Sequence, residues 1–304
     1  MNQLRWLTRT IALIAIFVSG YIVVTQPHLL FGDPDAPPPI RELAQAYDCG
    51  AEGEACDVSG RHYNALIPKG DGPFPVVMFF HGSHSNGDKI VVNHRLAGPL
   101  LERGYALVAP TALDITYSGN RRGTGWLNEG QRGERDDHRF VIDVIGDMGD
   151  RFPIDRDRIL MAGHSNGAIF LWYLACADIH PKLRSFAPIN GTPVRHQLGH
   201  CENPRPRFNL LHTHGRLDET VPFIGRNPAD GSWSTLGAEE AMTGLLTHQN
   251  CGEITEEIAQ PFRIHTWTRC NSNHSYKMVV FEGGHFMPRA WPDFALDWFE
   301  GLLH

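Results

Sequence analysis

The sequence predicts an α/β fold in which a doubly wound, mostly parallel sheet carries helices on both faces. The first observation is that short apolar runs, typical of buried strands, alternate with longer helix-like segments from residue 75 to the C-terminus. The second is the pentapeptide GHSNG at residues 163–167, which stands directly between one such strand and one such helix. In a chain of 304 residues, this regular alternation favours one folded unit over two.

Each element is expected from its own pattern of apolar residues. Buried strands are predicted at residues 75–80, 105–109, 158–163, 185–189, 208–215 and 277–284. Helices are predicted near residues 90–103, 137–151, 168–175, 238–250 and 291–303. Residues 111–135 are rich in glycine and arginine and are expected to form a long loop, and loops of this length are commonly functional.

The pentapeptide has the pattern G-x-S-x-G, which between a strand and a helix is typical of a nucleophile elbow. In this turn the serine adopts a strained backbone conformation that exposes its hydroxyl at the end of the sheet. Gly163 and Gly167 suit the turn because the strand and the helix pass too close there for side chains. Since the pattern also occurs by chance, its partners decide whether Ser165 is a nucleophile.

An acid and then a histidine must follow such a serine in chain order, each on a loop after a later strand. Asp218 lies three residues past Gly215, where one predicted strand ends, and His285 directly follows the double glycine of another. We therefore expect His285 to accept the proton of Ser165, and Asp218 to orient the imidazole. In isolation Asp218 and His285 would be an ordinary loop carboxylate and a surface histidine, but the complete ordered set favours catalysis.

Hydrogen-bond donors for an oxyanion are expected from two backbone N–H groups. One belongs to Asn166, which follows the nucleophile, and the other to Ser83, which follows the strand at 75–80. The alternative is that His81-Gly82 forms only an ordinary turn at the end of a strand. Four side chains are predicted to contact substrate, namely His81, Trp126, Trp233 and Phe286. Each of the two tryptophans could equally pack beneath its loop.

Further motifs accompany these residues, among them Asp136-Asp137-x-x-Phe140, His214-Gly215-x-x-Asp218 and Gly283-Gly284-His285. With them, residues 48–304 resemble the polyhydroxybutyrate depolymerase and feruloyl esterase group of α/β-hydrolases, a secreted branch related to carbohydrate esterase family 1 and LpqC-type proteins. The resemblance implies an α/β-hydrolase fold and a serine esterase whose nucleophile, acid and base are Ser165, Asp218 and His285.

The chain departs from that group beside the expected acyl pocket. Ser83-His84 replaces the cysteine or glutamine that often follows the oxyanion turn, and Phe286-Met287-Pro288 replaces threonine-tryptophan-proline. The resemblance therefore leaves the substrate open among a feruloyl ester on plant polysaccharide, a hydroxyalkanoate polyester or oligomer, and a related small ester. Phe286 and Met287 would make the wall of the pocket apolar.

Two alternatives to an esterase remain at this point. A serine peptidase of the same architecture would use the same triad on amides, but no propeller-sized N-terminal region is present to restrict access to peptides. A binding protein that keeps the fold without turnover is a second alternative, and the intact set of three catalytic residue types argues against it.

Composition excludes other classes of partner. The formal net charge of −7 and the lack of basic clusters after the N-terminal segment give no reason to expect a nucleic acid. Seventeen histidines invite a metal site, above all His212-x-His214 and His81-x-x-His84. Neither pair has cysteine or carboxylate ligands at a recognisable spacing, so we expect no metal and no cofactor.

The N-terminus indicates export. Arg5 and Arg9 precede an uncharged apolar stretch at residues 10–25, and the turn-rich segment 32–39 follows it. Residues 1–31 are therefore expected to be either a cleaved signal peptide or a membrane anchor. A proline-rich linker at 32–47 and a catalytic domain at 48–304 would follow, so that the enzyme is secreted or periplasmic, or tethered to a membrane facing outward.

All six cysteines follow the apolar stretch, and an even number outside the cytosol suggests disulfides. Spacing alone does not settle which cysteines pair. Pairing of nearest neighbours is preferred, with Cys251–Cys270 also implied by the resemblance: Cys49–Cys56, Cys176–Cys201 and Cys251–Cys270. The alternative for Cys176 is a small buried residue of a helix.

Overall fold

The computed structural model describes residues 38–116, 122–128, 131–198, 207–229, 233–271 and 273–303. The chain divides into two compact units, Met1–Pro38 and Pro39–His304, and the description below concerns the second. The predicted signal peptide or anchor at residues 1–31 lies outside the described residues. Of the helices that are described, none is long and apolar enough to cross a membrane.

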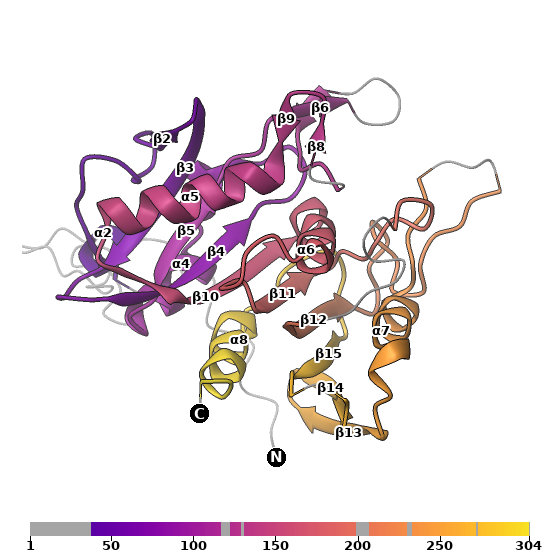
Figure 1. The fold of residues 1–304 in the computed structure, drawn as a ribbon. Helices are drawn as coiled ribbons and strands as arrows, with labels where there is room; N and C mark the ends of the chain where they lie inside the picture. The colour runs from indigo at the N-terminus through magenta and orange to yellow at the C-terminus, as the bar shows by residue number, and fades with distance from the viewer. Residues whose placement is uncertain are drawn as a thin grey trace, which may run out of the picture. The chain divides into compact units, whose positions relative to one another are not determined.

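An 11-stranded sheet forms the centre of this unit (Figure 1). Its middle strands are all parallel, in the order β5 (Ala106–Pro110), β4 (Phe74–Phe80), β10 (Ile154–His164), β11 (Ser185–Ile189), β12 (Asn209–Gly215) and β15 (Tyr276–Phe281). Antiparallel strands extend both edges, namely β1 (Ala44–Gln45), β2 (Cys56–Val58) and β3 (Arg61–Pro68) on one side, and β14 (Phe262–Thr268) and β13 (Glu253–Ala259) on the other. The predicted fold class is confirmed.

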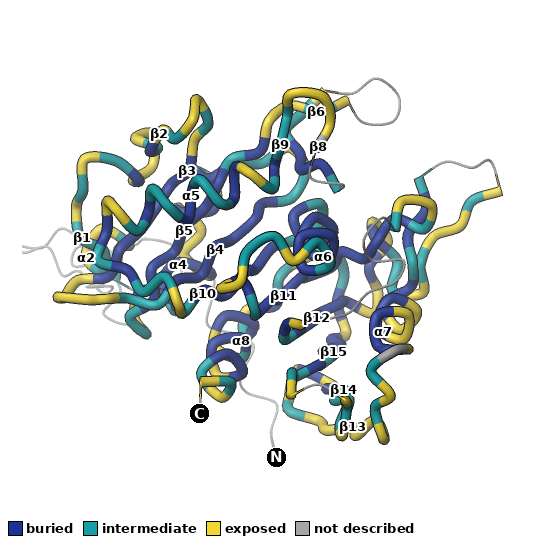
Figure 2. The backbone as a smooth tube through the Cα atoms, in the orientation of Figure 1, coloured by how far each residue is buried: buried dark blue, intermediate teal, exposed yellow. Residues whose placement is uncertain are grey.

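Helices cover both faces of the sheet. One apolar cluster joins the sheet to α5 (Asp137–Arg151), α6 (Asn166–Ala177) and α7 (Ala238–Leu246), and a second joins it to α3 (Gly87–Val91), α4 (His94–Glu102) and α8 (Trp291–Glu300). Successive residues of β4 point alternately into the two clusters, as a pleated strand requires. Strands buried on both faces are nearly continuous apolar runs, which is why the sequence predicts them well (Figure 2).

Two predicted helices differ from those in the structure. The helix expected near 90–103 is divided into α3 and α4, because Asn86 and Asn93 each cap a separate helix by accepting a backbone N–H, from Lys89 and Arg95 respectively. The helix expected near 238–250 ends at Leu246 and continues as a short 3₁₀ turn, η3 (Thr247–Gln249).

The predicted linker is too long. Residues 40–45 form α2 (Ile40–Leu43) and β1, which pairs with β3, and the folded unit begins at Pro39 rather than at residue 48. Ile40, Leu43 and Ala44 pack against the second apolar cluster. Burial of these side chains holds the segment on the domain although a proline run precedes it.

The segment at 111–135, predicted as a loop, contains two short ladders where it is described. They are β6 (Asp114–Thr116) with β7 (Arg122–Thr124), and β8 (Gln131–Arg132) with β9 (Arg135–Asp136).

Two of the predicted disulfides, Cys49–Cys56 and Cys251–Cys270, are present. The second closes the β13–β14 hairpin. Cys201 lies outside the described residues, so its pairing with Cys176 stays a prediction.

Candidate active site

The turn at Ser165 has the geometry of a nucleophile elbow. Ser165 separates β10 from α6 and has φ 57° and ψ −121°, a conformation that L-residues rarely adopt. A Cβ on Gly163 would lie 3.0 Å from the Phe80 carbonyl oxygen, and one on Gly167 would overlap the same oxygen. The Ser165 N–H donates to the Ile189 carbonyl at 3.0 Å, so that β11 also holds the elbow. Close packing thus excludes a side chain at Gly167 and leaves little room for one at Gly163.

The three side chains predicted to act together are within hydrogen-bonding distance. β12 and β15 are neighbouring parallel strands, so the loops that carry Asp218 and His285 leave the sheet at the same edge. His285 Nε2 lies 2.8 Å from Ser165 Oγ, and His285 Nδ1 lies 2.7 Å from Asp218 Oδ2. Two hydrogen bonds therefore link the three side chains, one between Ser165 and His285 and the other between His285 and Asp218.

Asp218 is held as a charged acceptor. The carboxylate is 4% exposed, and its Oδ1 accepts the N–H groups of Thr220 and Val221, each at 2.9 Å. Burial alone would raise the pKa of Asp218, but the hydrogen bonds from His285 and from the Val221 N–H outweigh it and hold the pKa below its usual value. With Oδ1 occupied, Oδ2 is left to face the imidazole.

The loop after β4 lies directly over the nucleophile. A Cβ added to Gly82 would lie 3.2 Å from the Ser165 Cβ, so a side chain at residue 82 would crowd the hydroxyl. Ser83 follows in the same loop. Asn166 is the first residue of α6, and the first N–H groups of a helix have no carbonyl partner within it. The assignment of the Ser83 and Asn166 N–H groups as oxyanion donors stays a prediction.

His81 supports this loop from below. It is 0% exposed, accepts the Ala112 N–H at Nε2 over 3.0 Å, and lies with Nδ1 2.7 Å from the Gly82 carbonyl oxygen. Because a carbonyl only accepts, Nδ1 carries the proton and the ring is neutral. Burial lowers the pKa of His81 to about 4. The predicted contact of His81 with substrate does not fit this burial.

The other residues predicted to contact substrate lie in different environments. Trp126 is 1% exposed and donates its indole N–H to the His81 carbonyl, which corresponds to packing beneath its loop. Trp233 is half-buried against the core, 5.9 Å from the Arg226 guanidinium. Phe286 is 53% exposed directly after His285, and it is the one of the four predicted residues that presents a large apolar surface to solvent.

Several supporting residues were not foreseen from the sequence. Asn190, which follows β11, contacts the loops of both Asp218 and His285. The ring of His164 lies 4.7 Å from that of His285, centre to centre. Buried Asp137 binds the guanidinium of Arg135 and accepts the Leu127 N–H, and so fixes the loop beside the site. Asn190 precedes glycine, a common turn signal, but a turn signal does not reveal which loops a side chain joins.

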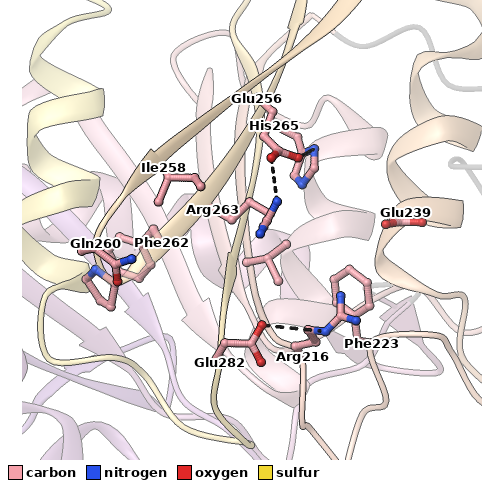
Figure 3. A pocket seen from close by; sticks show the side chains of 12 residues that line it. Arg216, Phe223, Glu239, Glu256, Ile258, Gln260, Phe262, Arg263, His265 and Glu282 are labelled. Carbon is pink, nitrogen blue, oxygen red and sulfur yellow. Dashed lines mark hydrogen bonds and ion pairs between the residues drawn. The ribbon is translucent and has the colours of Figure 1, made fainter.

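A pocket of about 590 Å³, whose lining does not include the three triad residues, lies where β13, β14 and β15 approach α7 (Figure 3). Four of its charged side chains form two ion pairs, Arg263 with Glu256 at 2.6 Å and Arg216 with Glu282 at 3.8 Å, and Glu239 on α7 lies apart from both pairs. Within the described residues, no cluster of histidine, cysteine and carboxylate side chains could hold a metal ion.

Comparison with known proteins gives the following. No model of a known protein family matches the chain. The chain is 25% identical over 166 residues to the bifunctional acetylxylan esterase/xylanase XynS20E of Neocallimastix patriciarum, a match that covers 54% of this chain and only 22% of that protein.

Among solved structures, the chain resembles the acetyl xylan esterase from Aspergillus awamori, with a TM-score of 0.57 and 13% identity, over 80% of this chain and 94% of that one. It resembles esterase PE8 with a TM-score of 0.51 and 18% identity, over 78% and 96% of the two chains. TT1662 from Thermus thermophilus is similar with the same score and identity, over 83% and 97%. The chain therefore has the α/β-hydrolase fold, and the relatives that it resembles include esterases, in agreement with the resemblance drawn from its motifs.

Proposed function

We propose that the protein is a serine hydrolase that cleaves carboxylic esters through an acyl-enzyme. The observation that carries the proposal is the chain of two short hydrogen bonds from Ser165 through His285 to Asp218. Serine is a poor nucleophile at neutral pH, and an imidazole at hydrogen-bonding distance is the group that activates it.

The reaction follows from this geometry. Ser165 Oγ attacks the carbonyl carbon of the ester while its proton passes to His285 Nε2, and Asp218 stabilises the imidazolium that forms. The tetrahedral intermediate then collapses, Nε2 returns the proton to the leaving alkoxide, and the acyl group remains on Oγ. A water molecule, deprotonated by the same nitrogen, releases the carboxylic acid and regenerates the hydroxyl.

The oxyanion of the tetrahedral intermediate is assigned to the backbone N–H groups of Ser83 and Asn166. The proximity of Gly82 to Ser165 supports the first, and the start of α6 supports the second. The helix also directs the positive end of its dipole toward the developing negative charge.

The motifs and the relatives also suggest which esters the enzyme hydrolyses. The motifs suggest hydroxyalkanoate or feruloyl esters, and the relatives named above add acetylated xylan as a candidate. The exposed ring of Phe286 beside His285 favours an ester with an apolar portion on that side. Disulfide bonds persist in oxidising compartments, so the two that are present support an exported enzyme. In the same proposal, residues 1–31 are either cleaved as a signal peptide or retained as a membrane anchor.

A turnover screen tests the proposal. Wild-type protein and Ser165→Ala are compared on p-nitrophenyl acetate and butyrate, methyl ferulate, short hydroxybutyrate oligomers, acetylated xylan and a peptide amide. We expect hydrolysis of one or more esters by the wild type, none by the variant, and no cleavage of the amide. Cleavage of the amide alone would favour a peptidase. Inactivity on every substrate would favour a binding protein, and equal rates for both proteins would exclude Ser165.

A further inference from the structure

Asn190 lies where the three catalytic loops meet. It directly follows β11 and is 0% exposed, with a positive φ of 52°. Its neighbour Ile189 accepts the Ser165 N–H at 3.0 Å, so the end of β11 already contacts the elbow. The Asn190 N–H donates to the Thr213 carbonyl at 2.9 Å and anchors the residue to β12.

The side chain of Asn190 joins the other two loops. Its Oδ1 accepts the N–H of Gly215 at 2.8 Å, at the start of the turn that carries Asp218. Its Nδ2 donates to the carbonyl of Phe286 at 3.0 Å and to that of Gly284 at 3.3 Å, the residues on either side of His285. Both functional ends of one amide are therefore used, one on the acid loop and the other on the base loop.

Asparagine suits this position for two reasons. It tolerates a positive φ better than most residues with a side chain. It also accepts with one end and donates with the other, whereas an aspartate of the same shape would turn an acceptor toward two carbonyl oxygens. Because the Asn190 side chain is buried, leaving one of its polar groups unpaired would cost the desolvation of that group.

We propose that Asn190 is a positioning residue that sets His285 in register with Ser165 and Asp218. Its side-chain hydrogen bonds run to the backbone of the acid and base loops, and it acts by fixing the backbone on both sides of the general base. The inference rests on the proposed ester hydrolysis. A displacement of about 1 Å between reacting groups can cost up to about 10²-fold in rate, so loss of this amide should reduce kcat.

Asn209 provides a matched control at the opposite end of the same strands. Its Oδ1 accepts the Ser275 N–H at 2.8 Å, and its Nδ2 donates to the Arg184 carbonyl at 3.2 Å. It thus joins the chain around β11, β12 and β15 in the same way, but at their amino ends, away from the triad. Asn190→Asp and Asn209→Asp each keep the acceptor and remove the donor.

The experiment measures kcat and KM on p-nitrophenyl acetate for the wild type, both aspartate variants and Asn190→Gly, together with their thermal unfolding. Asn190→Gly accommodates the positive φ and provides a folded variant if the buried carboxylate prevents folding. We expect a loss of kcat of roughly 10- to 100-fold for both variants at residue 190, with KM nearly unchanged, and wild-type kcat for Asn209→Asp.

A second measurement does not depend on turnover. The Nδ1 proton shared between His285 and Asp218 should give a downfield proton resonance in the wild type and in Asn209→Asp, and a shifted or lost resonance in Asn190→Gly. Wild-type kcat and an unchanged resonance in the variants at residue 190 would overturn the proposal, as would an equal loss of kcat in Asn209→Asp. A wild-type protein that is inactive on every ester of the turnover screen would refute the proposed ester hydrolysis, whereas the resonance would still test the role of Asn190.

Discussion

Replacing Asp218 with asparagine should impair catalysis while leaving the shape of the site unchanged. Asp218 Oδ1 receives the N–H groups of Thr220 and Val221, each at 2.9 Å. The amide oxygen of an asparagine must take that place, because an NH₂ group there would face two donors. The NH₂ group is then left facing His285 Nδ1. The imidazole would have to accept at Nδ1 and carry its proton on Nε2, where it can no longer accept the proton of Ser165.

The expected loss in kcat is on the order of 10⁴-fold, as found when the same tautomer error is imposed on other triads, and it corresponds to roughly 5 kcal/mol of transition-state stabilisation. The assay is kcat on p-nitrophenyl acetate near neutral pH, with thermal unfolding to show that the variant is folded. Asp293→Asn, at an exposed carboxylate on α8, is the control and should retain the wild-type rate. A loss smaller than about 10-fold for Asp218→Asn would refute the tautomer argument and the assignment of Asp218 as the acid.

Three further predictions concern stability. Burial lowers the pKa of His81 from 6.5 to about 4, so the unfolded chain binds a proton on this residue at a higher pH than the folded protein does. As the pH falls from 6.5 to 4, the free energy of unfolding should therefore decrease by about 3 kcal/mol because of His81. A free energy of unfolding that stays constant over this range in urea titrations would contradict the neutral burial of His81. Gly167→Ala should lower the free energy of unfolding by about 1–3 kcal/mol, because the added methyl group overlaps the Phe80 carbonyl oxygen. The control is Gly146→Ala on α5, where the added methyl group meets no atom within 4 Å, and thermal unfolding should show it to be neutral or stabilising. Replacing both Cys251 and Cys270, which are 19 residues apart, should lower the free energy of unfolding by about 3 kcal/mol without changing kcat. A loss of kcat with unchanged stability would show that the β13–β14 hairpin affects the active site.

The parts of the fold that the sequence predicts are those whose side chains are buried on both faces. The strand at 75–80 lies within one residue of β4, and the strand at 185–189 matches β11, because continuous apolar runs too short for a helix and bounded by turns are typical of fully buried strands. β13 went unnoticed because nearly all of its residues are exposed, so it has no apolar pattern. It forms because β14 and the Cys251–Cys270 bond hold it at the edge of the sheet.

The candidate site also contains residues that the sequence predicts and residues that it does not. Ser165, Asp218 and His285 could be selected from the sequence because the order of motifs and the ends of strands constrain them together. The contacts of Asn190 could not, since they depend on how closely two loops approach and no local pattern encodes that distance. His81 was predicted to contact substrate, but it is buried and contacts the backbone of Gly82 and Ala112, so it supports the loop instead.

The most direct test of the central claim is covalent labelling with a fluorophosphonate, which reacts with a serine activated by a neighbouring base. The modified protein is digested and the adduct is located by mass spectrometry. We predict one adduct on the peptide that contains Ser165 in the wild type, greatly slowed labelling in His285→Ala, and no adduct in Ser165→Ala. An unlabelled wild-type protein, or an adduct on another residue, would contradict the assignment of Ser165 as the activated nucleophile.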